Sequence, residues 1–239
     1  MKIQLIVLYL CSISVFCQNA QNLGVTYGVE RLEQVDYQSI TNSSAKEVLY
    51  SRLALLPEIE FKLNICNGTS IFRYLEKLEV NKELSKAANL TGGSYIFFKS
   101  DSIYYKQTTS FGSKLNIILS NDYYKNWQIT GEKKSILGFE CYKAITYKEI
   151  ITKDLERTNQ LITAWFTPEI NIQAGPQGLD NLPGLVLEGS INGMYNFIAK
   201  TINDEGCKGM EVPDGGKFIS EVTYQKMISE ILKDIKSRG

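Results

Sequence analysis

The segment Ala164–Gly189, AWFTPEINIQAGPQGLDNLPGLVLEG, carries the clearest indication of how this chain folds. It places Pro168, Pro176 and Pro183, three of the five prolines, between two apolar runs. A proline has no N–H to donate within a helix, and the apolar content is too high for a solvated loop. We therefore expect a strand, a buried extended connection, a tight turn and a second strand within this segment, which we call the signature segment.

The turn of the signature segment is expected at Pro183-Gly184. Proline fixes φ at the second position of a type II turn, and glycine readily adopts the positive φ that the third position requires. Leu182 and Leu185 flank the pair. We expect both leucines to be buried and to anchor the turn in the core.

The strand that precedes the turn is expected to be buried on both faces. Trp165 and Phe166 are consecutive, so their side chains point to opposite faces of the strand. Pro168 cannot donate to a neighbouring strand and marks the point where this strand leaves the sheet. After the turn, alternation of side chains places Val186 and Glu188 on the same face.

Outside the signature segment, the strongest local pattern is a hairpin. Residues 58–66 alternate between apolar and polar side chains, Asn67-Gly68 follows, and residues 69–75 make the return. Asn-Gly supplies the positive φ angles that a type I′ turn needs. Upstream, Ser44–Glu47 has the form of a capping box and predicts a short helix, with a strand over residues 48–55 as the alternative.

The remaining patterns predict a mainly β protein. Further strands are expected over residues 23–33, 94–99, 103–107, 114–119, 127–130, 139–147, 160–167, 185–190 and 194–202. A final helix is expected over residues 220–236, where apolar side chains recur on one stripe. Short, closely spaced strands joined by turns favour an antiparallel sheet over βαβ units. We expect a single antiparallel, strongly curved sheet or an incomplete barrel, with a few helices that include the C-terminal one.

The N-terminus has the pattern of a secretory signal peptide. Lys2 precedes an apolar run that ends at Phe16, and this run is shorter than the roughly 20 apolar residues that span a bilayer. Cleavage is expected after Cys17, with Ala20 as a second candidate. Residues 1–17 are thus expected to be a signal peptide, and residues 18–239 a single β domain without a transmembrane segment. This domain is expected to be exported and soluble, in the periplasm or associated with the outer envelope.

The composition excludes several classes of function. The chain of 239 residues has 26 basic and 26 acidic side chains, and this balance predicts neither nucleic acid nor anionic lipid as a partner. It has no histidine, which removes Ser-His-Asp and Cys-His catalysis, the usual zinc and copper sites, and the commonest general base. We therefore expect no metal, no cofactor and a non-enzymatic protein.

Three cysteines remain after the expected cleavage, namely Cys66, Cys141 and Cys207. An exported compartment favours disulfides, and an odd number leaves one thiol unpaired. All three pairings are open, and we expect Cys141–Cys207, because a bridge to a core strand would hold down the loose loop around Cys207. Cys66 ends a strand beside a tight turn, where it is expected to pack as a small apolar side chain.

Two upstream motifs accompany the signature segment, Trp127-x-Ile129-Thr130 and Ile136–Ala144, ILGFECYKA. Together with Asn181–Val186, NLPGLV, they resemble the GLPGLI family, envelope proteins of Bacteroidetes-type bacteria with no established activity. The resemblance covers about residues 61–202 and implies a β domain of the cell envelope. It departs from the family pattern where Asn181 replaces a glycine and Gln177 replaces an aromatic residue. The expected sheet also remotely resembles the incomplete barrel of lipoprotein-carrier proteins.

The signature segment supplies the candidate binding residues. They are Trp165, Pro168, Glu169, Pro183, Gly184, Leu185 and Glu188. A segment with few convergent polar groups is more typical of a folding element that closes one end of a sheet, so the structural role is favoured. Tyr104-Tyr105, Tyr123-Tyr124 and Trp127 could form a stacking platform, but without interleaved basic residues strand packing is favoured.

Three functions are compatible with these observations. The leading hypothesis is an exported binding or assembly protein whose concave, apolar face holds a hydrophobic ligand or an outer-membrane partner. The alternative is a hydrolase that uses two carboxylates, Glu169 with Glu188 or Glu188 with Asp180, because a pair of unequal pKa can do acid–base work. A third possibility is a module that docks onto an outer-membrane protein through an exposed strand edge.

Overall fold

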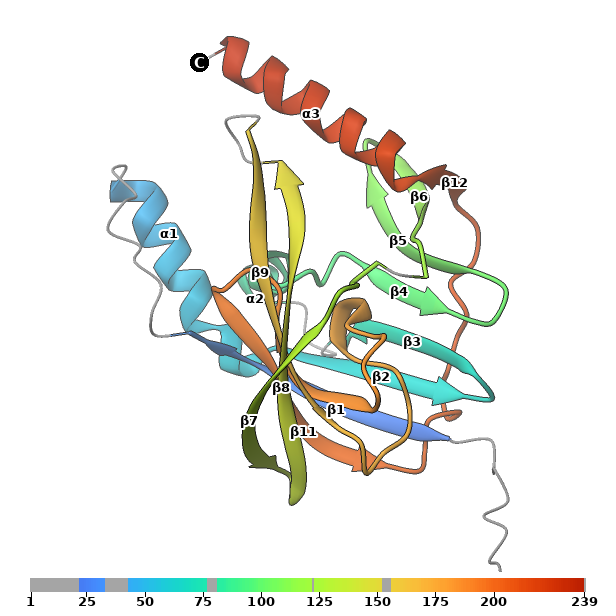
Figure 1. The fold of residues 1–239 in the computed structure, drawn as a ribbon. Coiled ribbons are helices and arrows are strands. Elements are labelled where there is room, and N and C mark those ends of the chain that lie inside the picture. The colour runs from blue at the N-terminus through green and yellow to red at the C-terminus, as the bar shows by residue number, and fades with distance from the viewer. Residues whose placement is uncertain (1–21, 33–42, 77–80, 122, 152–155, 239) are drawn as a thin grey trace, which may run out of the picture.

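The computed structural model of the chain describes residues 22–32, 43–76, 81–121, 123–151 and 156–238. These residues form one twelve-stranded sheet and three α-helices (Figure 1). The expected signal peptide, residues 1–17, lies outside the described residues. The prediction of a mainly β fold built on one sheet is confirmed.

The sheet consists of two runs of consecutive strands joined by the first strand, β1 (Leu23–Arg31). The first run comprises β2 (Glu60–Cys66), β3 (Thr69–Tyr74), β4 (Ile96–Lys99), β5 (Tyr104–Ser110) and β6 (Ser113–Ile118). The second run comprises β7 (Gln128–Ile136), β8 (Phe139–Ile151), β9 (Arg157–Thr167), β10 (Leu185–Ser190) and β11 (Tyr195–Asn203). Because β1 pairs with both β2 and β11, it lies in the interior of the sheet.

The sheet is open, and its edge strands among the described residues are β7 and β12 (Lys217–Ser220). Strand β12 is parallel to β6, whereas all other neighbouring strands are antiparallel. The predicted strands end earlier than the observed β7 and β8, the predicted strand at β9 begins three residues late, and β12 was not predicted. Most of β7 is exposed and its middle, Glu132–Lys134, is charged, as is usual for an edge strand, so it lacks the alternation that predicts a strand.

The predicted hairpin, the predicted helix near residue 44 and the predicted C-terminal helix are confirmed. Asn67 and Gly68 have φ of 49° and 77° and connect β2 to β3 as a hairpin. The capping-box region forms helix α1 (Ser43–Ala54) rather than the alternative strand. Helix α2 (Lys82–Leu90) begins after Asn81, whose side chain accepts hydrogen bonds from two backbone N–H groups. The C-terminal helix is α3 (Glu221–Arg238), which extends across the molecule from the end of β12 (Figure 1).

Aromatic side chains fill the core against the central strands. Phe61 stacks on Phe72 with ring centroids 5.1 Å apart, and Phe197 meets Phe61 edge-on at 5.1 Å. Tyr27 is fully buried, and its hydroxyl donates a 2.6 Å hydrogen bond to the carbonyl of Val186. The apolar interior beside β1, β2 and β11 is therefore packed with side chains.

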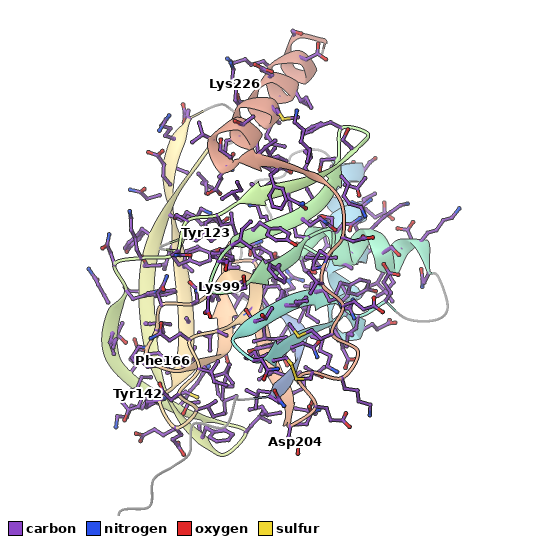
Figure 2. All side chains as sticks on the ribbon, turned by 90° about the vertical axis from the view of Figure 1, so that its right-hand side faces the viewer. Lys99, Tyr123, Tyr142, Phe166, Asp204 and Lys226 are labelled. Atoms are coloured by element: carbon purple, nitrogen blue, oxygen red, sulfur yellow. A yellow bond between two sulfur atoms is a disulfide. The ribbon has the colours of Figure 1, made fainter. Side chains whose placement is uncertain are left out.

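The sheet is strongly curved. Strands β5 and β8 are the third and the eleventh in the sheet order, yet Lys106 of β5 and Lys148 of β8 both contact Tyr123. Figure 2 shows Tyr123 in the interior of the molecule, between the long strands of the second run and those of the first. The curvature therefore brings side chains from distant strands together on the concave side of the sheet.

A long segment, residues 204–216, crosses the face of the first run opposite the aromatic core, and we call it the strap. It connects β11 in the interior of the sheet to β12 at the edge. Side chains of the sheet hold it through its backbone carbonyls: Asn64 donates to Gly206 at 2.8 Å and Asn116 donates to Gly215 at 2.8 Å. Because the strap carries the chain across the sheet, β12 arrives parallel to its neighbour β6.

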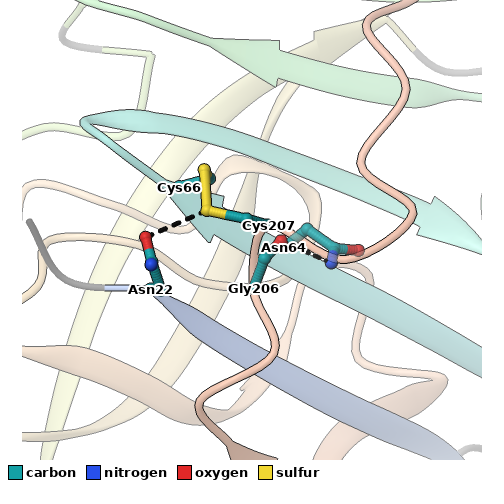
Figure 3. Close-up of a disulfide and its surroundings, with 5 residues drawn as sticks. All are labelled: Asn22, Asn64, Cys66, Gly206 and Cys207. Atoms are coloured by element: carbon teal, nitrogen blue, oxygen red, sulfur yellow. Dashed lines mark hydrogen bonds between the residues drawn. A yellow bond between two sulfur atoms is a disulfide. The ribbon is translucent and has the colours of Figure 1, made fainter.

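A disulfide between Cys66 and Cys207 fixes the strap to the end of β2 (Figure 3). Their Cα atoms are 4.9 Å apart. The predicted Cys141–Cys207 bridge is therefore wrong, while the prediction of one bridge and one unpaired thiol is confirmed. The reason is the path of the strap, which passes over β2 and not over β8. Cys141 is buried, and burial raises the pKa of its thiol to about 11.

Candidate functional site

A cavity of about 850 Å³ opens on the concave side of the sheet, between helix α3, strand β5 and the β8–β9 hairpin. Its aromatic wall is formed by Tyr95, Tyr123, Tyr124 and Tyr195. We call it the tyrosine cavity. In Figure 2, Tyr123 lies below Lys226 of α3, which is at the rim of this cavity.

Tyr123 and Tyr124 come from the connection between β6 and β7, residues 119–127. Because β6 and β7 lie near opposite ends of the sheet, this connection crosses the concave side. The two rings meet edge to face with centroids 4.8 Å apart, and Tyr104 packs edge-on against Tyr123 at 6.3 Å. Burial raises the pKa of Tyr123 and of Tyr124, so both hydroxyls are neutral hydrogen-bonding groups.

Two lysines enter the tyrosine cavity from opposite sides. The Lys148 Nζ lies 3.3 Å from the centroid of the Tyr123 ring, and the Lys106 Nζ donates to the Tyr123 hydroxyl at 3.2 Å. A cation over an aromatic face is attracted by the ring quadrupole, most strongly where water is excluded. Burial lowers the pKa of Lys148 to about 8 and also lowers the pKa of Lys106.

One carboxylate, that of Glu221, is shared by these two lysines. Its Oε1 lies 3.4 Å from the Lys148 Nζ and 3.9 Å from the Lys106 Nζ. Glu221 is the first residue of α3, so the helix begins at the cavity wall. Elsewhere on the wall Arg157 and Glu149 pair with each other at 2.6 Å. Two ammonium groups thus face a single carboxylate at the centre of the site.

The signature segment lies beside the tyrosine cavity and supports it. The Asn181 Nδ2 donates to the carbonyl of Asn121 at 2.7 Å and to that of Tyr124 at 3.3 Å. The Trp127 Nε1 donates to the carbonyl of Asp180 at 3.0 Å. These bonds hold both ends of the connection that carries the tyrosines. Asn181 has a φ of 61°, a conformation that Asn and Gly adopt readily.

The turn at Pro183-Gly184 is tighter than predicted. Gly184 N–H donates to the carbonyl of Leu182 at 2.7 Å, whereas Leu185 N–H donates to Ile170 at 3.0 Å. The turn therefore spans Leu182, Pro183 and Gly184. It is not type II, because the N–H of Leu185, which would close a four-residue turn, donates to Ile170 instead. Gly184 has a φ of 154°, and a Cβ there would clash with the carbonyl oxygen of Thr167. The predicted burial of Leu182 and Leu185 is confirmed.

Trp165 and Glu188 lie opposite each other on β9 and β10. A register shift between Val186 and Glu188 breaks the alternation, so the prediction that these two share a face is wrong. Phe166 is buried but Trp165 is half-buried, with the Lys134 Nζ 4.2 Å from its ring centroid. Glu188 accepts from this Nζ at 2.6 Å.

The other predicted residues are also engaged within the fold. Pro168 is exposed and follows the last residue of β9, as predicted. The exposed Glu169 carboxylate accepts the N–H of Glu140 at 2.8 Å. Asp180 is buried and pairs with the Lys99 Nζ at 2.5 Å. The carboxylates proposed for hydrolysis, including Glu188, thus each have a separate partner.

None of the seven predicted binding residues of the signature segment lines the tyrosine cavity as it is described. Tyr123-Tyr124 is visible in the sequence as an aromatic pair, but the expectation that no basic residue is interleaved is wrong, since Lys106 follows Tyr104-Tyr105 and Lys125 follows Tyr123-Tyr124. Lys106 and Lys148 come from other strands, and Glu221 from the C-terminal helix. Gln177, singled out by the resemblance, does line the cavity, and its side chain donates to the carbonyl of Thr91 at 2.5 Å.

In the part of the chain that the structure describes, no group of three or more Cys, Asp or Glu side chains is arranged to hold a metal ion. Among the same residues, no helix is both long and apolar enough to span a membrane.

Comparisons with known proteins identify solved structures of similar fold and a family. Two crystal structures of PNGF-II, in space groups P21 and C2, each match with a TM-score of 0.50 and 15% identity, over 87% of this chain. The chain spans 33% of the length of those structures, and the likeness at this identity concerns the fold. No curated protein sequence matches. The family model described as "N-glycanase peptide, N-terminal domain" matches residues 80–226. This match covers more than half of the chain, so the chain belongs to the N-glycanase peptide N-terminal domain family.

Proposed function

We propose that this domain is a non-catalytic binding module and that the tyrosine cavity holds its ligand. The supporting observation is an open cavity of about 850 Å³ in which aromatic faces and polar groups converge. Its volume lies in the range of small-molecule sites, roughly 300–1,000 Å³. The ring hydroxyls, the two lysines and Gln177 supply hydrogen bonds beside the aromatic faces.

The ligand class that suits this wall best is a carbohydrate. A sugar ring has a C–H face that packs on aromatic rings and hydroxyl groups that exchange hydrogen bonds with polar side chains. The packed aromatic core leaves little room for a fully hydrophobic ligand beside β1 and β2, and the tyrosine cavity is lined by charged and amide side chains as well as by aromatic rings. Membership in a family named after an N-glycanase supports a glycan ligand.

We also propose that the domain is exported and acts in the cell envelope, as the GLPGLI resemblance implies. The Cys66–Cys207 disulfide supports an oxidising compartment, since such bridges rarely persist in the cytosol. An outer-membrane protein remains the proposed partner of the exported domain. Secretion of the full chain with removal of residues 1–17, measured by mass spectrometry of the N-terminus, tests the location.

Titration of the purified protein with neutral N-glycans, followed by calorimetry, tests the binding role. We expect binding by the wild-type domain and a loss of about tenfold in affinity for Tyr123→Ala, because the substitution removes the ring and hydroxyl that position Lys148 and Lys106. Tenfold corresponds to about 1.4 kcal/mol, close to the value of one hydrogen bond to a charged group. Tyr147→Ala is the matched control, since Tyr147 precedes Lys148 on β8 but is 60% exposed and outside the cavity. Absence of binding by every glycan tested would remove the proposal.

A further inference from the structure

We propose that the tyrosine cavity recognises an acidic carbohydrate, whose carboxylate or sulfate group binds between Lys106 and Lys148. This inference rests on the proposed function, and it specifies the charge of the ligand.

The two lysines retain hydrogen-bonding capacity for a ligand oxygen. Each ammonium group has three N–H donors. Lys106 donates to the Tyr123 hydroxyl, and Lys148 donates to Glu221 at 3.4 Å. The distances from Glu221 to the two Nζ atoms, 3.4 and 3.9 Å, exceed the roughly 2.7–2.9 Å of a strong charge-assisted hydrogen bond. Glu221 thus pairs weakly with both lysines and leaves N–H donors of each ammonium group available to a ligand oxygen.

Burial makes a second anion favourable here. The Lys106 side chain is 10% exposed and the Lys148 side chain 24% exposed, so water solvates both ammonium groups poorly. Charges removed from water are stabilised by counter-charges. A ligand carboxylate in the cavity that bridges the two Nζ atoms would supply a second counter-charge in addition to that of Glu221.

The other charged side chains of the cavity also favour a negatively charged ligand. Arg157 and Glu149 neutralise each other, and the exposed Lys226 adds a positive charge at the rim. The lining as a whole has four basic and two acidic side chains. A cationic ligand would face this excess of positive charge.

The binding of such an anion should depend on pH. The groups that face Lys148 are Lys106 from β5, Tyr123 and Tyr124 from the β6–β7 connection, and Glu221 from α3. Burial and the nearby Lys106 lower the pKa of Lys148 to about 8, against the opposing effect of Glu221. The positive charge is present below this pKa and is lost above it. Affinity for the acidic ligand should therefore fall between pH 7 and pH 9.

Matched pairs of glycans that differ only in charge test the proposal. One pair is a sialylated biantennary N-glycan and the same glycan with its sialic acid carboxylates converted to methyl amides, and the other is a galacturonate trisaccharide and its carboxyl-reduced form. Calorimetry at neutral pH should show at least about tenfold tighter binding of an acidic member, and excess inorganic sulfate should compete with it. For Lys106→Met and Lys148→Gln we expect this preference to vanish. Lys143→Gln, on the same strand but facing Trp165, should keep it.

The outcomes separate the two proposals. Equal binding of acidic and neutral members would overturn the anion site and leave the binding role intact. An acidic preference that survives in Lys106→Met and Lys148→Gln would also overturn it, because the anion would then bind elsewhere. Absence of binding by all four glycans would overturn both proposals. Circular dichroism of each variant verifies that the fold is retained.

Discussion

At the scale of single residues, Lys148 shows that a charged group in the tyrosine cavity lowers the stability of the folded protein. Its pKa is about 8 in the folded protein, against an ordinary value of 10.5. Lys148 therefore holds its proton less tightly in the folded protein than in the unfolded chain. Each unit of such a shift corresponds to about 1.4 kcal/mol. Keeping this ammonium group charged in a partly dry cavity therefore destabilises the folded state, as is often observed for binding sites.

The Lys148→Met variant should accordingly be more stable than the wild type at pH 7, by about 2–3 kcal/mol in free energy of unfolding. In the wild type, stability should rise from pH 8 toward pH 9.5, because the unfolded chain binds more protons in this window. The variant should lack most of this rise. Urea unfolding at several pH values measures both effects, and a Lys148→Met protein that is less stable at pH 7 would contradict the argument.

Gly184 is the residue of the signature segment least tolerant of change. A side chain there needs a φ of 154° and meets the carbonyl of Thr167. Gly184→Val should therefore lower the free energy of unfolding by more than about 3 kcal/mol, the sum of backbone strain and steric displacement. Gly138→Ala is the control, because Gly138 has a φ of 86° but open space around its Cβ position. Its effect should stay near 1 kcal/mol, and equal losses for both variants would show that the close approach to Thr167 is unimportant.

At the scale of elements, the strap depends on its disulfide. The Cys66–Cys207 bridge links residues 141 positions apart, and closing so long a loop is worth about 5 kcal/mol on the chain-entropy model. Replacing both cysteines by serine should therefore lower the free energy of unfolding by up to about 5 kcal/mol. Hydrogen exchange should increase along the strap and β12. Cys141→Ala, which leaves the bridge in place, should leave exchange in the strap unchanged; a strap that stays protected without the bridge would refute this role.

The Asn181 side chain links two elements, the signature segment and the β6–β7 connection. Asn181→Gly retains the backbone conformation but loses the hydrogen bonds to Asn121 and Tyr124. We expect a loss of about 1–2 kcal/mol in stability and weaker glycan binding, because the connection carries the cavity tyrosines. Calorimetry and urea unfolding measure the two quantities. Unchanged affinity in this variant would show that the connection is positioned without the signature segment.

Elements defined by local signals were predictable from the sequence, whereas those defined by distant contacts were not. The hairpin at Asn67-Gly68 and helix α1 follow from neighbouring residues. Strand β12 exists because the strap delivers it to β6, and a four-residue exposed strand has no pattern of its own. The bridge partner of Cys207 likewise depends on which strand the strap crosses.

At the scale of the whole molecule, β1 joins two runs of strands into one sheet. It pairs with β2 along one side and with β11 along the other, and its valines and tyrosine contribute to the shared core. Removal of residues through Arg31 should therefore abolish cooperative unfolding of the entire domain. A Lys46→Gln variant, in the exposed helix α1, should unfold like the wild type. Persistent hydrogen-exchange protection of β7 to β11 in the truncated protein would show that the second run folds on its own.

The curvature of the sheet limits how much of the candidate site can be predicted from the sequence. The strands and their aromatic side chains are visible in the sequence, and they gave the mainly β class correctly. The meeting of Lys106, Lys148 and Glu221 around Tyr123 is not visible there, since alternation reports only which face a side chain takes. How far a sheet bends, and therefore which strands face each other, depends on packing of the whole domain.

The central position of β1 also sets the order in which this protein can fold. Its pairing with β2 uses residues 23–28 and 60–65, which are made early, whereas its pairing with β11 waits for residues 195–203. During synthesis the open side of β1 therefore lacks its partner until most of the chain has emerged. Contacts of such long sequence separation slow folding, and unpaired strand edges promote association between chains. The incomplete sheet is thus the stage at which a chaperone that covers strand edges would have its greatest effect on yield.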